Sequence, residues 1–190
     1  MMTPNDLKVS TQLDVLIDAQ LIQAKVKELG IRISDDYKGK HLHLICILKG
    51  ACIFLADLIR YLPIDTTLDF MAVSSYKEGQ RSSGEVRIVK DLGFTIQGRE
   101  VLIVEDILDT GLTLDFLSRY LWTRGPKSLN MCTLLSKRSR RTKDVAATYV
   151  GFEIPDEFVV GYGLDYAQKF RNLTTISILR KNEKSSSHWG

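Results

Sequence analysis

The stretch VLIVEDILDTGLTL, residues 101–114, decides the fold of this chain. Its first four residues are apolar, as in a buried strand, and the segment that begins at Leu112 has the apolar spacing of an amphipathic helix. Glu105, Asp106 and Asp109 lie between the two. A strand that passes through a short polar loop directly into a helix is the repeating unit of an α/β fold.

The segments on either side repeat this alternation of strands and helices. Asp18 is placed to cap a helix over residues 19–37, and a helix over residues 50–62 would stop at Pro63. The remaining strands are expected at HLHLICIL (41–48), TTLDFMAVSS (66–75), SLNMCTLLS (128–136), ATYVGF (147–152), FVVGYG (158–163) and TTISIL (174–179). The pattern predicts an α/β fold with a parallel sheet covered on both faces. With no repeat or linker, residues 1–190 read as one domain.

The composition excludes several classes of protein. The chain has 190 residues and a net charge of +3, which is too small to favour nucleic acid. No apolar run approaches the ~20 residues of a membrane span. The start, MMTPNDLKVS, lacks the apolar core of a secretory signal. Cys46, Cys52 and Cys132 lie in apolar stretches without metal-binding spacing, so we expect buried, reduced thiols in a cytoplasmic protein.

The residues after VLIV predict a phosphate site. In parallel sheets the ligand crevice lies beyond the carboxyl ends of the strands. A helix that begins near Leu112 leaves its first amide N–H groups unpaired, and Gly111 lets the backbone come close to a ligand. Thr110 and Thr113 add hydroxyl donors. The loop is not a Walker loop, because the GxxxxGK[ST] pattern is missing.

The carboxylates beside this loop need another partner. Adjacent carboxylates accept hydrogen bonds from a vicinal diol, and they also bind divalent cations. A phosphate on the loop with a sugar on Glu105 and Asp106 describes a ribose phosphate, and Asp109 would face the other side of the sugar. An acidic strand end before a capped helix would explain the acidic pair alone, but not the whole run.

Two polar stretches allow more than one interpretation. YKEGQRSSGEVR (76–87) is either a flexible loop or the tip of a long hairpin whose returning arm is VRIVKDL (86–92). The basic run KRSRRTK (137–143) favours a solvated face for Arg138, Arg140, Arg141 and Lys143, with a nucleic-acid patch as the alternative.

The segment EDILDTGLTL resembles the signature of the purine phosphoribosyltransferases, specifically the hypoxanthine-guanine phosphoribosyltransferases. Four further segments match, and the resemblance extends from the second helix to Arg171: ILKGA (47–51), SSYKEGQRSSGEV (74–86), LLSKRSRR (134–141) and EFVVGYGLDYAQKFRNL (157–173). It implies a Rossmann-like sheet with a flexible loop at about 74–90 and a purine-binding hood at about 150–180. It also implies transfer of phosphoribosyl from 5-phosphoribosyl 1-pyrophosphate (PRPP) to N9 of hypoxanthine or guanine, giving IMP or GMP and pyrophosphate in purine salvage.

The resemblance assigns a pyrophosphate site and a catalytic base. Lys49 and Gly50 would form a pyrophosphate loop with a cis-capable Leu48–Lys49 bond, and Ser75 and Tyr76 would close over the reacting centre. Arg171 would reach the pyrophosphate. Asp109 would be the general base on a purine ring nitrogen.

The resemblance also assigns a purine site and a metal. Lys137 would donate to the purine 6-oxo group, Phe158 would stack on the ring, and Val159 would offer backbone groups to its edge. Asp165 would be the magnesium-side carboxylate beside the purine. Mg²⁺ would lie between the pyrophosphate and three carboxylates: Glu105, Asp106 and Asp165.

Other members of this fold remain as alternatives. One is an enzyme that prefers xanthine, and another is an RNA-binding regulator like the pyrimidine-operon attenuators, which the basic run would support. Leu112 stands where some members carry Lys, which hints at a bacterial or protozoal type. The family implies a homodimer or homotetramer without membrane contact.

Overall fold

The computed structural model describes residues 11–78 and 81–181, and its main body is a six-stranded sheet. The strand order is β4-β3-β2-β5-β6-β7. All neighbours are parallel except β3 and β4, which confirms the predicted parallel sheet. The strands are β2 (Leu42–Leu48), β3 (Thr66–Glu78), β4 (Arg81–Lys90), β5 (Glu100–Leu108), β6 (Ser128–Ser136) and β7 (Tyr149–Glu153).

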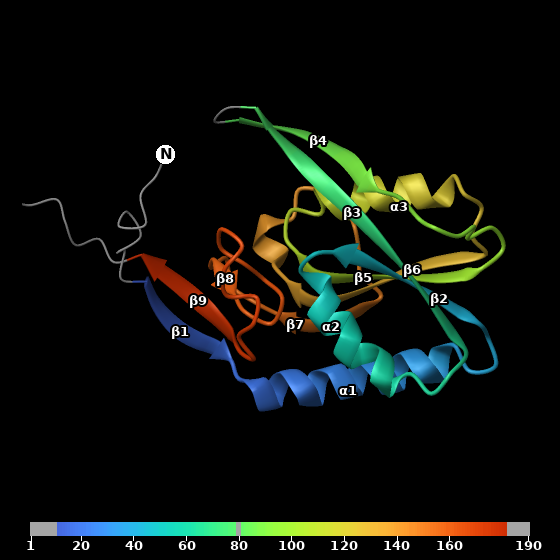
Figure 1. Cartoon of the computed structure of the whole chain (residues 1–190), viewed down its shortest axis with the longest axis horizontal. Helices are drawn as coiled ribbons and strands as arrows, with labels where there is room; N and C mark the ends of the chain where they lie inside the picture. Colours follow the sequence, from blue (N-terminus) through green and yellow to red (C-terminus); the bar gives the residue numbers. More distant parts are fainter. Residues whose placement is uncertain (1–10, 79–80, 182–190) are drawn as a thin grey trace, which may run out of the picture.

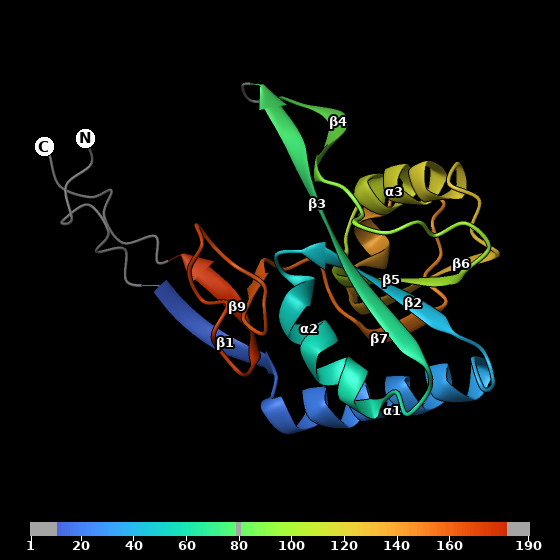
Figure 2. The same ribbon diagram turned by 45° about the vertical axis from the view of Figure 1, so that its right-hand side comes forward.

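Helices cover both faces of this sheet. Helices α1 (Ala19–Asp36) and α2 (Ala51–Leu58), with the single turn η1 (Ile59–Tyr61), lie on one face, and α3 (Leu112–Trp122) lies on the other (Figures 1 and 2). Asp18 caps α1 by accepting a hydrogen bond of 2.8 Å from the Leu21 amide, as predicted. Helices α1 and α2 bury their apolar stripes in one shared core cluster, and α3 buries its stripe in a second cluster. None of the described helices is long and apolar enough to cross a membrane.

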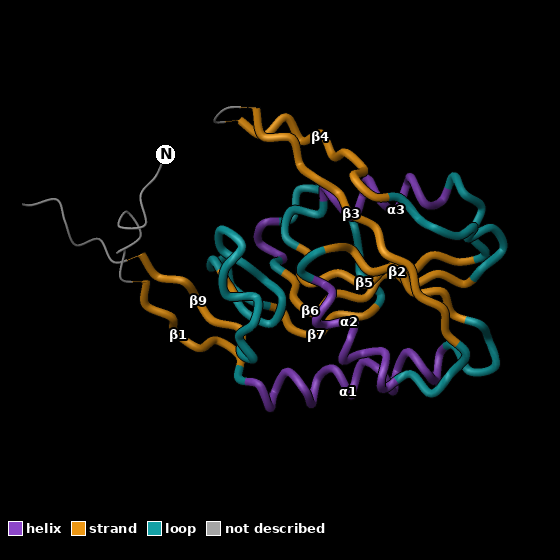
Figure 3. The backbone as a smooth tube through the Cα atoms, in the orientation of Figure 1, coloured by secondary structure: helices purple, strands orange, loops and turns teal. Residues whose placement is uncertain are grey.

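A second, antiparallel sheet lies beside the main body, and two of its strands fall in the region of the predicted hood, at about 150–180. It consists of β1 (Thr11–Ile17), β9 (Ile176–Lys181) and β8 (Val159–Val160) in that order. The first and last described strands thus lie side by side (Figures 1 and 3). Strands β7, β8 and β9 confirm the three short strands, whereas β1 was not predicted. Its pattern is ambiguous because Val15, an apolar residue, is 61% exposed.

The polar stretch 76–87 belongs to a long hairpin, so of the two predicted alternatives, a flexible loop or a hairpin, the hairpin is confirmed. Strand β3 continues to Glu78, and β4 returns antiparallel to it from Arg81. The hairpin projects beyond the rest of the sheet (Figure 2). Ser75 and Tyr76 lie in β3, and the roles of their side chains stay predictions. Residues 79–80, within the predicted flexible loop, lie outside the described residues.

Strand β5 differs from the prediction in its end point. It does not stop at Val104 but continues to Leu108, because Ile107 and Leu108 extend the ladder with Leu135 and Ser136 of β6. The acidic pair therefore lies inside the strand rather than in a turn after it. Helix α3 begins at Leu112 as predicted.

The predicted burial of the cysteine thiols is confirmed for two of the three cysteines. Cys46 and Cys132 are buried and free, and burial raises the pKa of both thiols. Cys52 is free but exposed, because it lies on the outer side of α2.

Candidate active site

A cavity of about 640 Å³ opens where β2 and β5 end. It collects residues that lie far apart in the sequence, as expected at the carboxyl edge of a parallel sheet. Its lining is Ile47 to Gly50, Val73, Val86, Glu105 to Leu114, Arg140, Asp165 and Arg171. The structure thus brings together the predicted ribose-phosphate and pyrophosphate residues, apart from Ser75 and Tyr76.

The predicted phosphate loop joins β5 to α3. Gly111 has a φ of 83°, in the left-handed region, and the first amides of α3 follow it at the cavity wall. A second segment holds the loop from outside. The amides of Thr142 and Lys143 donate to the Thr110 carbonyl oxygen at 2.9 and 3.3 Å. The loop is therefore fixed on one side and open to the cavity on the other.

Gly50 is required by the close approach of Asp106. An ideal Cβ at position 50 would lie 1.5 Å from Asp106 Oδ2, so no other residue fits without moving this carboxylate. Gly163 of the hood packs on the same turn: its own Cβ would lie 2.1 Å from the Gly50 carbonyl oxygen. The preceding Leu48–Lys49 peptide is cis, in agreement with the resemblance.

The acidic pair is held in an unusual electrostatic environment. Burial, reinforced by the charge of Asp106, raises the pKa of Glu105 well above its ordinary value. Burial also raises the pKa of Asp106, which is only 9% exposed. The Oε2 atom of Glu105 is buried and has no hydrogen-bond partner among the described residues. A ligand that donates hydroxyl protons or brings positive charge would satisfy this pair.

Lys49 and Arg171, the two cationic side chains predicted to bind pyrophosphate, are held by a cluster of polar groups. Lys49 Nζ and Arg171 Nη2 each donate to Gln168 Oε1 at 3.4 Å. Arg171 also pairs with Asp165 at 2.6 Å and donates to the Gly163 carbonyl oxygen at 2.6 Å. Gln168 was not predicted, because nothing in the motif DYAQKFR distinguishes it from an exposed polar residue.

Of the four predicted purine residues, Asp165 lines this cavity, whereas Lys137, Phe158 and Val159 lie outside its lining. Lys137 is 7% exposed, its amide donates to the Leu108 carbonyl oxygen at 2.9 Å, and its Nζ is 3.9 Å from Asp156 Oδ1. Phe158 is 52% exposed and makes an edge contact with Tyr166, with ring centroids 5.8 Å apart. Val159 is buried in β8, where it pairs with β9.

The basic run is not simply a solvated face. Arg140 Nε lies 3.0 Å from Asp109 Oδ1, and Arg140 lines the cavity. The Arg141 guanidinium turns inward and donates to Ser136 Oγ at 2.8 Å. Arg138, Arg140 and Lys143 are exposed, as predicted for a solvated face, and Arg138 pairs with Glu153 at 3.1 Å. The prediction was wrong for Arg141, which is only partly exposed because the run folds back onto the Thr110–Thr113 loop, and it did not include the contact of Arg140 with Asp109.

The residues predicted to hold magnesium do not form a cage by themselves. Within residues 11–78 and 81–181 no three or more histidine, cysteine or acidic side chains converge as a metal-holding group. Asp165 pairs with Arg171 instead. Mg²⁺ commonly takes one or two carboxylates and completes its shell with substrate phosphates and water. The unsatisfied Glu105 Oε2 and the nearby Asp106 fit that arrangement.

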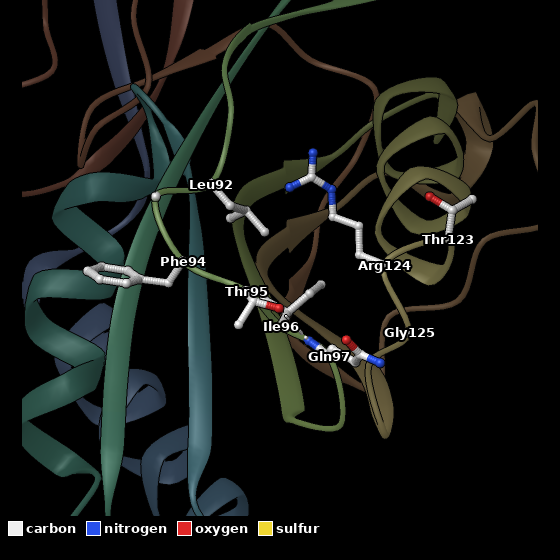
Figure 4. Close-up of a pocket in the computed structure, with 9 residues that line it drawn as sticks. Leu92, Phe94, Thr95, Ile96, Gln97, Thr123, Arg124 and Gly125 are labelled. Carbon is white, nitrogen blue, oxygen red and sulfur yellow. Dashed lines mark hydrogen bonds between the residues drawn. The ribbon is translucent and has the colours of Figure 1, made fainter.

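A second cavity of about 560 Å³ lies away from these residues. It is formed by the connection before β5, residues 92–97, and the end of α3, residues 123–125 (Figure 4). Its Arg124 already contacts Asp91 and Tyr120, and Phe94 points away from Arg124. None of the predicted site residues lines it, so the cavity at β2 and β5 is the candidate active site.

A parallel sheet with a glycine-containing loop between β5 and α3, a buried carboxylate pair in β5 and a small second sheet beside it is the arrangement expected of the phosphoribosyltransferases. The phosphoribosyl transferase domain family matches residues 12–167. Within that class, the chain belongs to the hypoxanthine-guanine phosphoribosyltransferase family.

Individual relatives match over almost their whole length. The hypoxanthine-guanine phosphoribosyltransferase of Mycobacterium avium is 52% identical over 93% of this chain and 87% of the relative. That of Staphylococcus aureus is 49% identical over 93% and 96%. A Bacillus anthracis hypoxanthine-guanine phosphoribosyltransferase crystal structure with HEPES in its active site has a TM-score of 0.84, with 44% identity over 90% of this chain and 100% of the other. A Staphylococcus aureus hypoxanthine phosphoribosyltransferase structure gives 0.86, with 48% identity over 91% and 94%.

Proposed function

We propose that this enzyme transfers the 5-phosphoribosyl group of PRPP to N9 of hypoxanthine or guanine, giving IMP or GMP and pyrophosphate. One observation carries this proposal: Asp109 and Lys137 are anchored at the same strand end. Asp109 follows Leu108 directly, and the Lys137 amide donates to the Leu108 carbonyl oxygen at 2.9 Å. A carboxylate and an ammonium held there match the two features of a 6-oxopurine, a ring N–H and a 6-oxo acceptor.

The arrangement of charge in the cavity fits departure of pyrophosphate from C1 of the ribose. The C1–O bond breaks with its electron pair on the pyrophosphate, and positive charge builds on the ribose ring. Lys49 and Arg171, held together by Gln168, would bind the leaving anion. Glu105 and Asp106 would orient the ribose hydroxyls. Mg²⁺ held by Glu105 and Asp106 would supply further positive charge to the pyrophosphate.

Asp109 is placed to take the proton that the purine loses. When N9 bonds to C1, a ring nitrogen must release one proton, and the carboxylate accepts it as a general base. The Oδ1 atom of Asp109 is buried and no hydrogen bond is directed at it within the described part of the chain. Its negative charge also favours the cationic ribose beside it.

Lys137 gives the proposed purine selectivity. An ammonium can only donate, so it pairs with a 6-oxo group and finds no acceptor in the 6-amino group of adenine. The 3.9 Å gap between its Nζ and Asp156 is too long for a strong hydrogen bond and leaves the donor available.

The two alternative functions have weaker support. The relatives named above are hypoxanthine-guanine rather than xanthine enzymes. The RNA-binding alternative rested on the basic run, yet Arg138 pairs with Glu153, and Arg140 lies against Asp109. Both side chains are exposed, but each is paired with a carboxylate, which lowers the net positive charge of this surface.

A spectrophotometric assay with PRPP and four purines tests the proposal. Turnover with hypoxanthine and guanine, little with xanthine and none with adenine is expected. Adenine as the best substrate would overturn the role of Lys137. RNA retained at physiological salt, with no turnover on any purine, would instead favour the regulator.

We further propose a cytoplasmic homodimer or homotetramer. The solved structure of a Trypanosoma cruzi hypoxanthine phosphoribosyltransferase is 45% identical to this chain, with a TM-score of 0.83. That structure addresses the role of the enzyme's C-terminal region in its oligomeric state. Light scattering coupled to size exclusion would give the subunit number, and a monomeric mass at micromolar concentration would contradict the proposal.

A further inference from the structure

Arg140 connects the proposed general base to the hood. It ends the single turn η2 (Arg138–Arg140) after β6 and lines the active-site cavity. Its Nε is 3.0 Å from Asp109 Oδ1, and its Nη1 is 3.4 Å from Asp156 Oδ1. With a side chain that is 47% exposed, Arg140 has room to change its conformation.

The cations of the cavity lie at two distinct places. Among the described lining residues, Lys49 and Arg171 both contact Gln168 and so belong to the pyrophosphate end. Arg140 instead lies on Asp109, the residue directly before the Thr110–Thr113 loop. The segment after Arg140 is tied to that loop, since the amides of Thr142 and Lys143 donate to the Thr110 carbonyl oxygen. Arg140 is therefore the lining cation at the phosphate-loop end.

Its contact with Asp109 is suited to exchange. The two charged atoms are close, but the N–H of Arg140 is not aimed at Asp109 Oδ1, which is buried without a hydrogen bond. The contact is thus mainly Coulombic. A guanidinium against this oxygen also obstructs the proposed proton transfer from the purine. Catalysis therefore requires Arg140 to have another partner when the substrates are bound.

We propose that Arg140 is a phosphate-binding residue that exchanges between Asp109 and the 5-phosphate of PRPP or of the product nucleotide. This inference rests on the proposed function. A phosphate offers a dianion and the paired oxygen geometry that a guanidinium binds best, so it competes effectively with a single carboxylate. Binding of the phosphate draws Arg140 away and leaves Asp109 Oδ1 open to the purine.

The variant Arg140→Gln tests this exchange, and Arg138→Gln is its matched control. Arg138 lies in the same turn, has a side chain that is 80% exposed, pairs with Glu153 and does not line the cavity. Ribose 5-phosphate and ribose are the binding probes, followed by steady-state kinetics with PRPP and hypoxanthine. Arg140→Gln should weaken ribose 5-phosphate binding and raise KM for PRPP about tenfold, the effect of one lost charge-assisted hydrogen bond. KM for hypoxanthine should change less than about twofold.

Each other outcome has a defined meaning. Unchanged ribose 5-phosphate affinity in Arg140→Gln, with a normal circular dichroism spectrum, would overturn the proposal. Equal losses for ribose and ribose 5-phosphate would also overturn it, because the effect would not depend on the phosphate. Arg140→Lys, which keeps the charge, should lie between wild type and Arg140→Gln, and serves if the latter fails to fold. A wild-type protein that binds ribose 5-phosphate but turns over no purine would refute the proposed function and still allow this comparison.

Discussion

Replacing Gly50 by alanine tests whether the position of the Asp106 carboxylate is essential. The added Cβ would lie 1.5 Å from Asp106 Oδ2 and 2.6 Å from its Cγ, whereas ordinary contacts begin at 3.4 Å. The carboxylate must therefore move by about 2 Å. Gly50 has helical φ and ψ of −60° and −43°, which alanine adopts readily, so backbone strain contributes nothing. Any loss of stability or activity would therefore come from the clash of the added Cβ with Asp106.

Two consequences of Gly50→Ala can be measured separately. Overpacking of this kind costs about 1–3 kcal/mol of the free energy of unfolding, which urea denaturation would show. Misplacement of a substrate-orienting group by an ångström or more lowers kcat/KM by about 100-fold, or about 2.7 kcal/mol of transition-state stabilisation. Steady-state assays with PRPP and hypoxanthine would report this loss.

A matched substitution and a double mutant complete the experiment. At Gly93 the nearest atom to an added Cβ is 3.7 Å away, so Gly93→Ala should leave both stability and kinetics nearly unchanged. In an Asp106→Ala background the stability cost of Gly50→Ala should largely disappear, because the clashing carboxylate is gone. Gly50→Ala with wild-type stability and wild-type kcat/KM would refute the reasoning.

Three further predictions concern the charged groups of the site. Asp109→Asn should lower kcat by about 10²- to 10⁴-fold while nucleotide affinity by equilibrium titration changes little; equal turnover would refute the base assignment. Lys137→Gln, whose amide can both donate and accept, should narrow the preference for hypoxanthine over adenine in competitive assays, and an unchanged preference would contradict the assigned role. Because the pKa of Glu105 is raised above 4.5, the folded state binds more protons than the unfolded state, and stability falls as the pH rises through the folded pKa. Glu105→Gln should thus be more stable than wild type in urea at about pH 8 and equal to it at about pH 4; no difference at either pH would remove the assigned burial effect.

The fold could largely be predicted because its signals are local. The Asp18 cap, the helix start at Leu112 and the bounds of β6 all follow from residues within a few positions. Strand β1 could not be predicted in this way, since its strand partner among the described residues is β9, which lies more than 150 positions later in the sequence. The predicted end of β5 was too early, because two adjacent carboxylates are more typical of a turn after a strand than of the strand itself.

The site was predictable where a motif is continuous and was missed where contacts are long-range. The Thr110–Thr113 loop follows from its own sequence. Gln168 joins the candidate site through its contact with Lys49, 119 residues away in the sequence, and its backbone has a φ of +65°, which is uncommon for a non-glycine residue and is not predictable from the residue type. Arg140 resembled its exposed neighbours, because only the folding of the basic run against Asp109 distinguishes it.

The turn at Gly50, proposed to bind pyrophosphate, packs directly against Gly163 in the predicted hood. Gly163 has a φ of +100°, and a Cβ there would lie 2.1 Å from the Gly50 carbonyl oxygen, so the two backbones are in direct contact. The Gly163 carbonyl oxygen accepts from Arg171, and the neighbouring Tyr162 hydroxyl donates to Asp57 of α2 at 2.6 Å. We therefore expect a shift of Gly50 on pyrophosphate binding to displace Gly163, whose carbonyl oxygen accepts from Arg171. Because Phe158 lies in the same predicted hood, we also expect such a shift to alter the shape of the proposed purine site.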